Sequence, residues 1–401
     1  MTTLKATDRT TIPDPAAEAL LDDRAREVRD RVREIVHAEV APRAAAVDAE
    51  ARFPTESYHA LADAGLAGLL VPERFGGTGD STLAYAAAME EITAACGSTS
   101  TVYMTQMHCA YPILLAGTDE QCERHLPGLC TGELYGALAV TEPQAGSDVS
   151  SLSTRAVRED DGYRLTGAKT FITNGDRAHV AVVFATTDPR RAREAATAFV
   201  VEGGTPGFAT GAVLEKMGQK GSTTAELFFD DAFVPTASRL GDEGSAYGLS
   251  IRSVTKSRVS AASQGVGFAR AALERAVRWA HERDLLSSGR RDAQDLQFGL
   301  ADLRARTAAA RSLLYTCAAL IDRGGPDPVN EVSIAKLFCT DTAMAVADAA
   351  MALMGADADR VDLGVERVWR DAKVTQIYDG TNQVQRLLIA RDLRRVAEEG
   401  A

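Results

Sequence analysis

Three features are missing from this 401-residue sequence: runs of basic residues, long apolar runs, and cysteines at paired spacings. Acidic residues outnumber lysine and arginine by 56 to 44, which gives a net charge of −12. An acidic chain without a basic patch is poorly suited to nucleic acid or to an anionic membrane surface. No stretch approaches the ~20 consecutive apolar residues of a membrane-spanning helix, so we expect neither kind of partner.

The six cysteines fit neither a disulfide framework nor a metal site, because no set of them has the spacing that such sites use. The histidines are scattered too, and we interpret His108 and His125 as ordinary helix residues, so no metal is expected. The polar N-terminus, which carries Asp8 and Asp14, lacks the apolar segment of a secretory signal. These features together predict a protein of the reduced cytoplasm.

The spacing of apolar residues changes twice along the sequence and divides the chain into three parts. Apolar residues at helical spacing, such as Val28, Val32 and Val36, are typical of its first third. From about Tyr135 short apolar runs alternate with turn pairs, which indicates an all-β domain, and helical patterns return beyond Gly244 with one break at residues 324–326. We predict an α+β multidomain protein with a loose tail at residues 1–15, a helical domain at 16–134, a β domain at 135–243 and a helical bundle at 244–401.

The most informative segment, residues 376–387, reads Gln-Ile-Tyr-Asp-Gly-Thr-Asn-Gln-Val-Gln-Arg-Leu. Asp379 and Gly380 form a turn that should open a helix, which would aim one carboxylate and several backbone N–H groups at the same point. Removal of a proton next to a thioester carbonyl requires such a base, with donors for the developing enolate oxygen. Taken alone, the segment is more typical of ordinary turn and cap chemistry than of a catalytic site.

Two further stretches accompany this turn: Val-Thr-Glu-Pro-Gln-Ala-Gly-Ser-Asp at residues 140–148 and Gly-Ala-Lys-Thr-Phe-Ile-Thr-Asn-Gly at residues 167–175. With the turn they resemble, in order and over roughly residues 20–395, the signatures of the acyl-CoA dehydrogenase family. The resemblance implies an N-terminal helical domain, a central β-barrel domain, a C-terminal four-helix bundle, and FAD as cofactor. No Gly-x-Gly-x-x-Gly motif follows a predicted strand, so a Rossmann site is not supported.

The resemblance implies a flavin site between the β domain and C-terminal helices of two neighbouring subunits, in a homo-oligomer that we expect to be a tetramer. It assigns to FAD the residues Val140, Thr141, Ser147, Phe171, Thr173, Arg283, Gln294, Gly355, Thr381 and Gln383. It assigns to the substrate Ser147, Arg258, Tyr378 and Gly380. For Arg258 a surface salt bridge is the alternative. Of the three phosphate-facing glycines of the family, only Gly355 remains within residues 352–358, where we expect Asp357 to repel a phosphate.

In the family mechanism a carboxylate removes the α-proton of an acyl thioester while a hydride leaves the β-carbon for the flavin N5. Most members carry glutamate where this chain has Asp379, which shortens the reach of the base by one methylene. Some branches place the base on another helix, at the position of Ser257 here, which has no carboxylate. Asp379 is therefore the only base that is compatible with the family pattern.

We predict FAD-dependent α,β-dehydrogenation of a thioester on CoA or an acyl carrier protein, with electrons passed to an electron-transfer flavoprotein. A branched, cyclic or polar acyl group would bring its α-proton within the shorter reach. Two alternatives stay open: a flavin-dependent monooxygenase on the same fold, and a non-catalytic flavin-binding member of the family.

Overall fold

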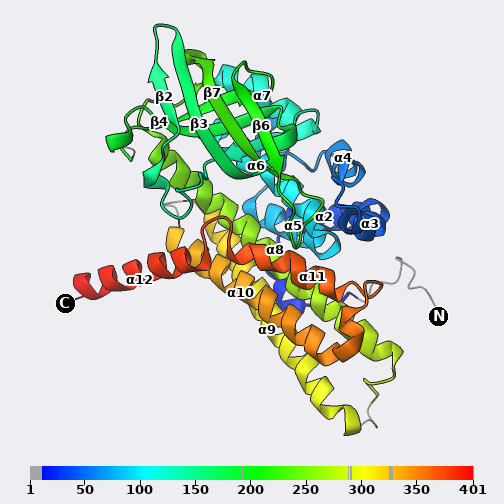
Figure 1. Cartoon of the computed structure of the whole chain (residues 1–401). Helices are drawn as coiled ribbons and strands as arrows, with labels where there is room; N and C mark the ends of the chain where they lie inside the picture. The colour runs from blue at the N-terminus through cyan, green and yellow to red at the C-terminus, as the bar shows by residue number, and fades with distance from the viewer. Residues whose placement is uncertain (1–10, 192, 288, 290, 325–327, 401) are drawn as a thin grey trace.

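The computed structural model of the chain describes residues 11–191, 193–287, 289, 291–324 and 328–400. Helices come first, a β-sheet follows, and long helices complete the chain, as Figure 1 shows. The predicted fold class and the order of its parts are confirmed. Residues 1–10 of the predicted tail, and residues 325–326 of the predicted break, lie outside the described residues.

The N-terminal helices surround two that are almost wholly buried. Their bounds are α1 Pro15–Glu18, α2 Asp23–Ile35, α3 Ala44–Ala49, α4 Thr55–Asp63, α5 Thr82–Ala95, α6 Gly97–Ala116 and α7 Asp119–Thr131. Every residue of α5 is buried, because its many alanines let neighbouring helices approach closely. The Ser81 hydroxyl caps α5, and a capping box formed by Thr118 and Gln121 starts α7.

The central part is an eight-stranded sheet in the described residues. Its strands are β1 Gly136–Ala139, β2 Arg155–Arg158, β3 Gly162–Thr173, β4 Val180–Thr186, β5 Ala196–Glu202, β6 Phe208–Val213, β7 Thr224–Pro235 and β8 Arg239–Leu240. The strand order is β6-β7-β3-β2-β4-β5-β8, and β1 pairs in parallel with β4. A shift of register between Lys169 and Ile172 interrupts the pairing of β3 with β7 and turns Phe171 outward.

The C-terminal part contains α8 Ala246–Glu282, α9 Gln294–Asp322, α10 Val329–Met354, α11 Val365–Ala372 and α12 Asn382–Glu399. Helices α8, α9 and α10 pack side by side, and α12 extends away from them (Figure 1). The stretch Val329–Asp359, which includes α10, is long and apolar enough to cross a membrane by length and composition alone, a property that the sequence analysis did not assign to it. Its packing against α8 and α9 explains the apolar composition as that of a core helix.

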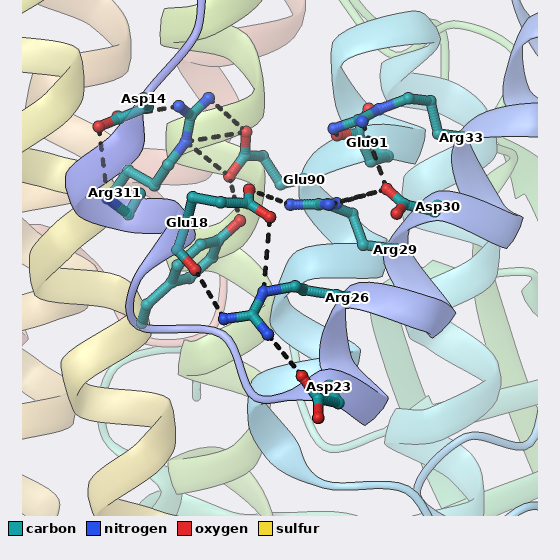
Figure 2. Close-up of polar contacts among 12 residues, drawn as sticks. Asp14, Glu18, Asp23, Arg26, Arg29, Asp30, Arg33, Glu90, Glu91 and Arg311 are labelled. Atoms are coloured by element: carbon teal, nitrogen blue, oxygen red, sulfur yellow. Dashed lines mark hydrogen bonds and ion pairs between the residues drawn. The ribbon is translucent and has the colours of Figure 1, made fainter.

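A network of buried and half-buried charges fastens the N-terminal segment to the bundle, as Figure 2 shows. Glu90 of α5 accepts hydrogen bonds from Arg311 of α9 at 2.6 Å, and Arg311 also binds Asp14 at 3.0 Å. Asp14 falls in the segment that we predicted to be a loose tail, yet Arg304 and Arg311 hold it against α9. Arg270 of α8 binds Glu91 through both of its terminal nitrogens at 2.8 Å.

Candidate active site

The turn that carries Asp379 lies directly before α12. Asp379 and Gly380 both have positive φ, 55° and 82°, a region that glycine adopts freely and aspartate more readily than bulkier residues. The Thr381 hydroxyl accepts a hydrogen bond from the Val384 N–H at 3.3 Å and so caps the helix. The predicted Asp-Gly turn at the start of a helix is confirmed.

Two buried cations support this turn. The Lys336 ammonium donates to the Gly380 carbonyl at 2.9 Å and to the Asn382 side chain at 2.8 Å. Burial lowers the pKa of Lys336 to about 8 and that of Arg258 to about 10, although the Asp379 charge acts to raise both. Arg258 is 7% exposed and donates to the Ser333 hydroxyl, so the surface salt bridge considered for it is wrong.

The Asp379 carboxylate lies beside His108, which lines a small cavity of about 10 Å³. Its Oδ1 atom lies 4.0 Å from Nδ1 of His108, and its buried Oδ2 atom has no hydrogen-bond partner among the described residues. The His108 Nε2 atom lies 3.3 Å from the Ser260 hydroxyl, which lies 2.8 Å from the Tyr85 hydroxyl. The lining residues are Leu70, Tyr85, Met107, His108, Tyr111, Ser253, Lys256, Ser257 and Ser260.

His108 lies in helix α6, as the sequence analysis interpreted it, but its position near the Asp379 carboxylate was not predicted. Burial lowers its pKa, against an opposing effect of the Asp379 charge, so the ring is neutral at pH 7. One signal was available, since Met104, Met107, His108 and Tyr111 recur at helical spacing and form one face of α6. A helix face that mixes apolar and polar residues can pack in the core or line a pocket. The sequence alone does not distinguish the two, because the Asp379 turn that His108 meets is far away along the chain.

A buried ion pair holds the stretch that we assigned to the flavin. The Lys169 ammonium donates to Glu142 at 2.7 Å and to the Val140 carbonyl at 3.1 Å, and both charged side chains are fully buried. Burial would raise the pKa of Glu142, but the Lys169 charge and the hydrogen bonds to the carboxylate lower it to about 2. Backbone N–H groups of Ser153 and Thr154 also donate to Glu142. The loop after β1 is thereby fixed against β3.

The residues beside this loop fit the edge and face of an isoalloxazine ring. Phe171 is 66% exposed with a φ of 58°, so a flat apolar side chain projects from β3. Thr173 pairs with Thr224 of β7, and the adjacent buried hydroxyls of Ser222 and Thr223 have no partner within the described part of the chain. A flavin needs an apolar surface for its face and polar groups for its pyrimidine edge. The donor set therefore fits FAD.

The predicted site residues fall into three groups in space, with Ser147 in a separate loop. Val140, Thr141, Phe171 and Thr173 lie at the sheet, while Tyr378, Gly380, Thr381 and Gln383 lie at the Asp379 turn. Ser147 is exposed in the loop after β1. Arg283, Gln294 and Gly355 lie at the far ends of α8, α9 and α10. Arg283 follows Arg258 by 25 residues along α8, a separation of roughly 38 Å in a straight helix, so the chain does not bring this group to its own turn.

The negative charge of Asp357 is compensated by arginines of the same chain, so it is not the isolated charge that we expected to repel a phosphate. Arg283 binds the Asp357 carboxylate at 2.7 Å, the Trp279 ring N–H donates to it at 2.9 Å, and Arg360 adds a longer contact at 3.4 Å. The aspartate therefore orients Arg283 and does not act as an isolated negative charge.

Family models match three successive parts of the chain. The N-terminal domain of acyl-CoA dehydrogenases matches residues 22–133, the middle domain matches 137–232, and the C-terminal domain matches 247–394. The chain belongs to the acyl-CoA dehydrogenase family. As a member of that family it is an oxidoreductase that acts on CH–CH groups and dehydrogenates acyl thioesters, as the sequence predicted.

Two relatives match this chain over nearly its whole length. An acyl-CoA dehydrogenase of Bacillus subtilis is 39% identical over 91% of this chain and 97% of its own. A cyclohex-1-ene-1-carbonyl-CoA dehydrogenase of Geobacter metallireducens is 41% identical over 91% of this chain and 96% of its own.

Solved structures agree with the fold. Butyryl-CoA dehydrogenase from Megasphaera elsdenii has a TM-score of 0.89 at 35% identity, covering 93% of this chain and 98% of that chain. The prolyl acyl carrier protein oxidase AnaB has a TM-score of 0.87 at 29% identity, with coverages of 93% and 99%. A glutaryl-CoA dehydrogenase from Mycobacterium smegmatis in complex with FADH2 has a TM-score of 0.87 at 26% identity, with coverages of 94% and 96%. FAD is the cofactor of this family, as the sequence predicted.

Proposed function

We propose that this protein removes the α-proton of an acyl thioester with Asp379. The observation that carries the proposal is the Asp379 carboxylate itself, whose Oδ2 atom is buried without a hydrogen-bond partner among the described residues, beside a pocket. A carboxylate oxygen with a free lone pair can accept a proton, whereas one that is already bound by donors is a weaker base. The backbone N–H of Asp379 is the donor for the thioester carbonyl.

The turn holds this base in place through its neighbours. Lys336 and Gln385 both donate to the Gly380 carbonyl, at 2.9 and 2.8 Å, so the peptide between Gly380 and Thr381 is fixed on one side. When bound along Phe171 and Thr173, FAD supplies the acceptor for the hydride that leaves the β-carbon. Val140, Thr141, Ser147, Thr381 and Gln383 complete the proposed FAD contacts, and Tyr378 and Gly380 those of the substrate.

The direct test is anaerobic mixing of the FAD-loaded protein with a panel of CoA and carrier-protein thioesters. We expect the flavin absorbance to bleach on mixing with at least one thioester, and the electrons to pass to an electron-transfer flavoprotein. Oxygenation of the thioester after external reduction, without anaerobic bleaching, would instead identify a monooxygenase. A protein that stays colourless with added FAD would identify a non-catalytic member of the family.

We further propose that the protein acts in the cytoplasm as a homo-oligomer, a tetramer of paired dimers. Arg283, Gln294 and Gly355 lie too far from the Asp379 turn of their own chain to complete its site, so they are available to a neighbour's FAD. The α12 helix also exposes Leu387, Leu393 and Val396, each more than half accessible. We expect sizing with absorbance detection to give a tetramer with one FAD per chain, and a monomer retaining stoichiometric FAD would contradict this.

A further inference from the structure

A closed ring of hydrogen bonds lies beside the Asp379 turn. The Tyr378 hydroxyl donates to Oε1 of Gln264, and Nε2 of Gln264 donates to the Thr101 hydroxyl at 3.0 Å. The Thr101 hydroxyl donates to Oε1 of Gln219 at 2.6 Å, and Nε2 of Gln219 donates back to the Tyr378 hydroxyl at 3.4 Å. Each side chain of this hydrogen-bonded ring both donates and accepts, so the donor direction is the same all the way round.

The hydrogen-bonded ring is buried and its donors are all used. The three partners of Tyr378 in it are each at most 3% exposed. The second amide N–H of Gln264 donates to the Ser100 hydroxyl at 2.6 Å, and that of Gln219 donates to the Asp371 carbonyl at 3.0 Å. Because the Tyr378 hydroxyl already donates to Gln264, it has no hydrogen left to donate to a substrate. Its aromatic face and its backbone remain for the substrate contact proposed above.

The members of the hydrogen-bonded ring come from separate parts of the chain. Thr101 lies on α6, and Gln264 lies on α8. Gln219 lies in the loop between β6 and β7, where it has a φ of 47°. Tyr378 directly precedes Asp379. The hydrogen-bonded ring therefore joins the N-terminal helices, the sheet and the C-terminal helices at the residue next to the proposed base.

Gln219 also connects this turn to the strands beside the proposed flavin site. Its backbone N–H donates to the Asp371 carboxylate of α11, which fixes the loop against the C-terminal helices. The loop leads into β7, which begins at Thr224, and Thr224 pairs with Thr173 of β3. A short path of hydrogen bonds thus runs from the strand that carries Thr173 to the turn that carries Asp379.

Proton removal and hydride transfer act on adjacent carbons, so the base must keep a fixed position relative to the strands that carry Phe171 and Thr173. We propose that the hydrogen-bonded ring positions Asp379, and that the Tyr378 hydroxyl holds the turn and does not bind the substrate. This inference rests on the proposed function, in which Asp379 is the base. Displacement of the turn would leave several buried polar groups unpaired at once, so the hydrogen-bonded ring resists it.

Two substitutions open the hydrogen-bonded ring at different points, and each removes one hydroxyl without adding bulk. In Tyr378→Phe and in Thr101→Val we expect the limiting rate of flavin reduction by an acyl thioester to fall about 10-fold, because misplacement of a catalytic group by about 1 Å can cost about 100-fold. The Kd of the thioester should stay within about twofold of the wild type, since only the position of the base changes. Thr101→Ser restores the hydroxyl and should recover most of the rate.

The double variant should be no slower than the slower single variant, because both substitutions open the same hydrogen-bonded ring. Anaerobic stopped-flow absorbance at several thioester concentrations gives the limiting rate and the Kd separately. Hydrogen–deuterium exchange of the protein without thioester tests the hold on the turn directly. We expect peptides that cover residues 376–384 to exchange faster in Tyr378→Phe and in Thr101→Val than in the wild type.

Tyr58→Phe is the matched control, because Tyr58 is also buried and also accepts a hydrogen bond from a glutamine, Gln106, at 2.9 Å. Tyr58 lies on α4, in the N-terminal part of the chain. We expect this control to keep the wild-type reduction rate and the wild-type exchange of residues 376–384.

An unchanged limiting rate in Tyr378→Phe would overturn the inference, whether the melting temperature falls or not. A raised Kd with an unchanged limiting rate would overturn it too, since the hydroxyl would then be a substrate contact. Failure of every thioester to reduce the wild-type flavin would overturn the proposed function. Faster exchange of residues 376–384 in the two variants would even then support the hold of the hydrogen-bonded ring on the turn.

Discussion

Asp379→Asn is expected to fold and to retain FAD, but to lose flavin reduction by acyl thioesters by a factor of about 1,000 or more. The amide matches the carboxylate in shape, and asparagine tolerates the positive φ of 55° at this position. It cannot accept the α-proton at neutral pH. Anaerobic stopped-flow absorbance measures the reduction rate, while the melting temperature and the flavin content serve as controls. Wild-type reduction by the Asn variant would remove the base from the proposed mechanism.

Asp379→Glu tests whether the site still suits the glutamate that most family members carry, or whether it has been rebuilt around the shorter aspartate. The Oδ1 atom already lies 4.0 Å from His108, so an added methylene would carry the carboxylate into the acyl space. Glutamate is also less favourable than aspartate at a positive φ. We expect activity to fall by at least about 10-fold, since misplacement of a catalytic group by about 1 Å can cost about 100-fold. Full activity with a shift toward straight-chain thioesters would show instead that the pocket still suits the longer base.

Arg270→Leu is expected to destabilise the protein by about 3–5 kcal/mol, because it removes one partner from a buried ion network. Arg270 binds Glu91 through both terminal nitrogens and reaches Glu90 at 2.9 Å. Burial would raise the pKa of Glu91, but Arg270 and Arg33 hold it well below its usual range. Without Arg270, Glu91 would keep Arg33 as a partner, and Glu90 would keep Arg311 and the Tyr315 hydroxyl.

The melting temperature of the FAD-loaded protein measures this effect, and we expect it to fall by several degrees. Arg52→Leu is the matched control, since Arg52 pairs with Glu56 at the surface, where solvent screens the interaction. The control should melt close to the wild type. A melting temperature for Arg270→Leu that equals that of the control would show that the network contributes little to stability.

The parts of the site that the sequence revealed are those encoded locally. The Asp-Gly turn, its helix cap at Thr381 and the order of helical and β parts depend on neighbouring residues or on periodicity, and the structure contains all of them. The central sheet, too, follows from short apolar runs between turn pairs.

The contacts that sequence reasoning missed join residues far apart in the chain. His108 meets the Asp379 turn from 271 positions away, and Asp14 meets Arg311 from 297 positions away. The sequence shows that a helix has a mixed face or that a residue is charged, but it does not show which distant residue will lie against that face or charge. Arg258 illustrates the same limit, because its buried position follows only from how α8 packs beneath the turn.

Proton removal can be separated from hydride transfer with an acyl-CoA in which sulfur replaces the β-methylene. Such a thioester has acidic α-protons but no β-hydrogen to give up, so only the base can act on it. Incubation of the FAD-loaded protein in deuterium oxide, followed by mass spectrometry of the thioester, measures exchange at the α-carbon. We expect the wild type to incorporate deuterium and Asp379→Asn not to exceed the rate without protein. Incorporation by Asp379→Asn at the wild-type rate would contradict the assignment of Asp379 as the base.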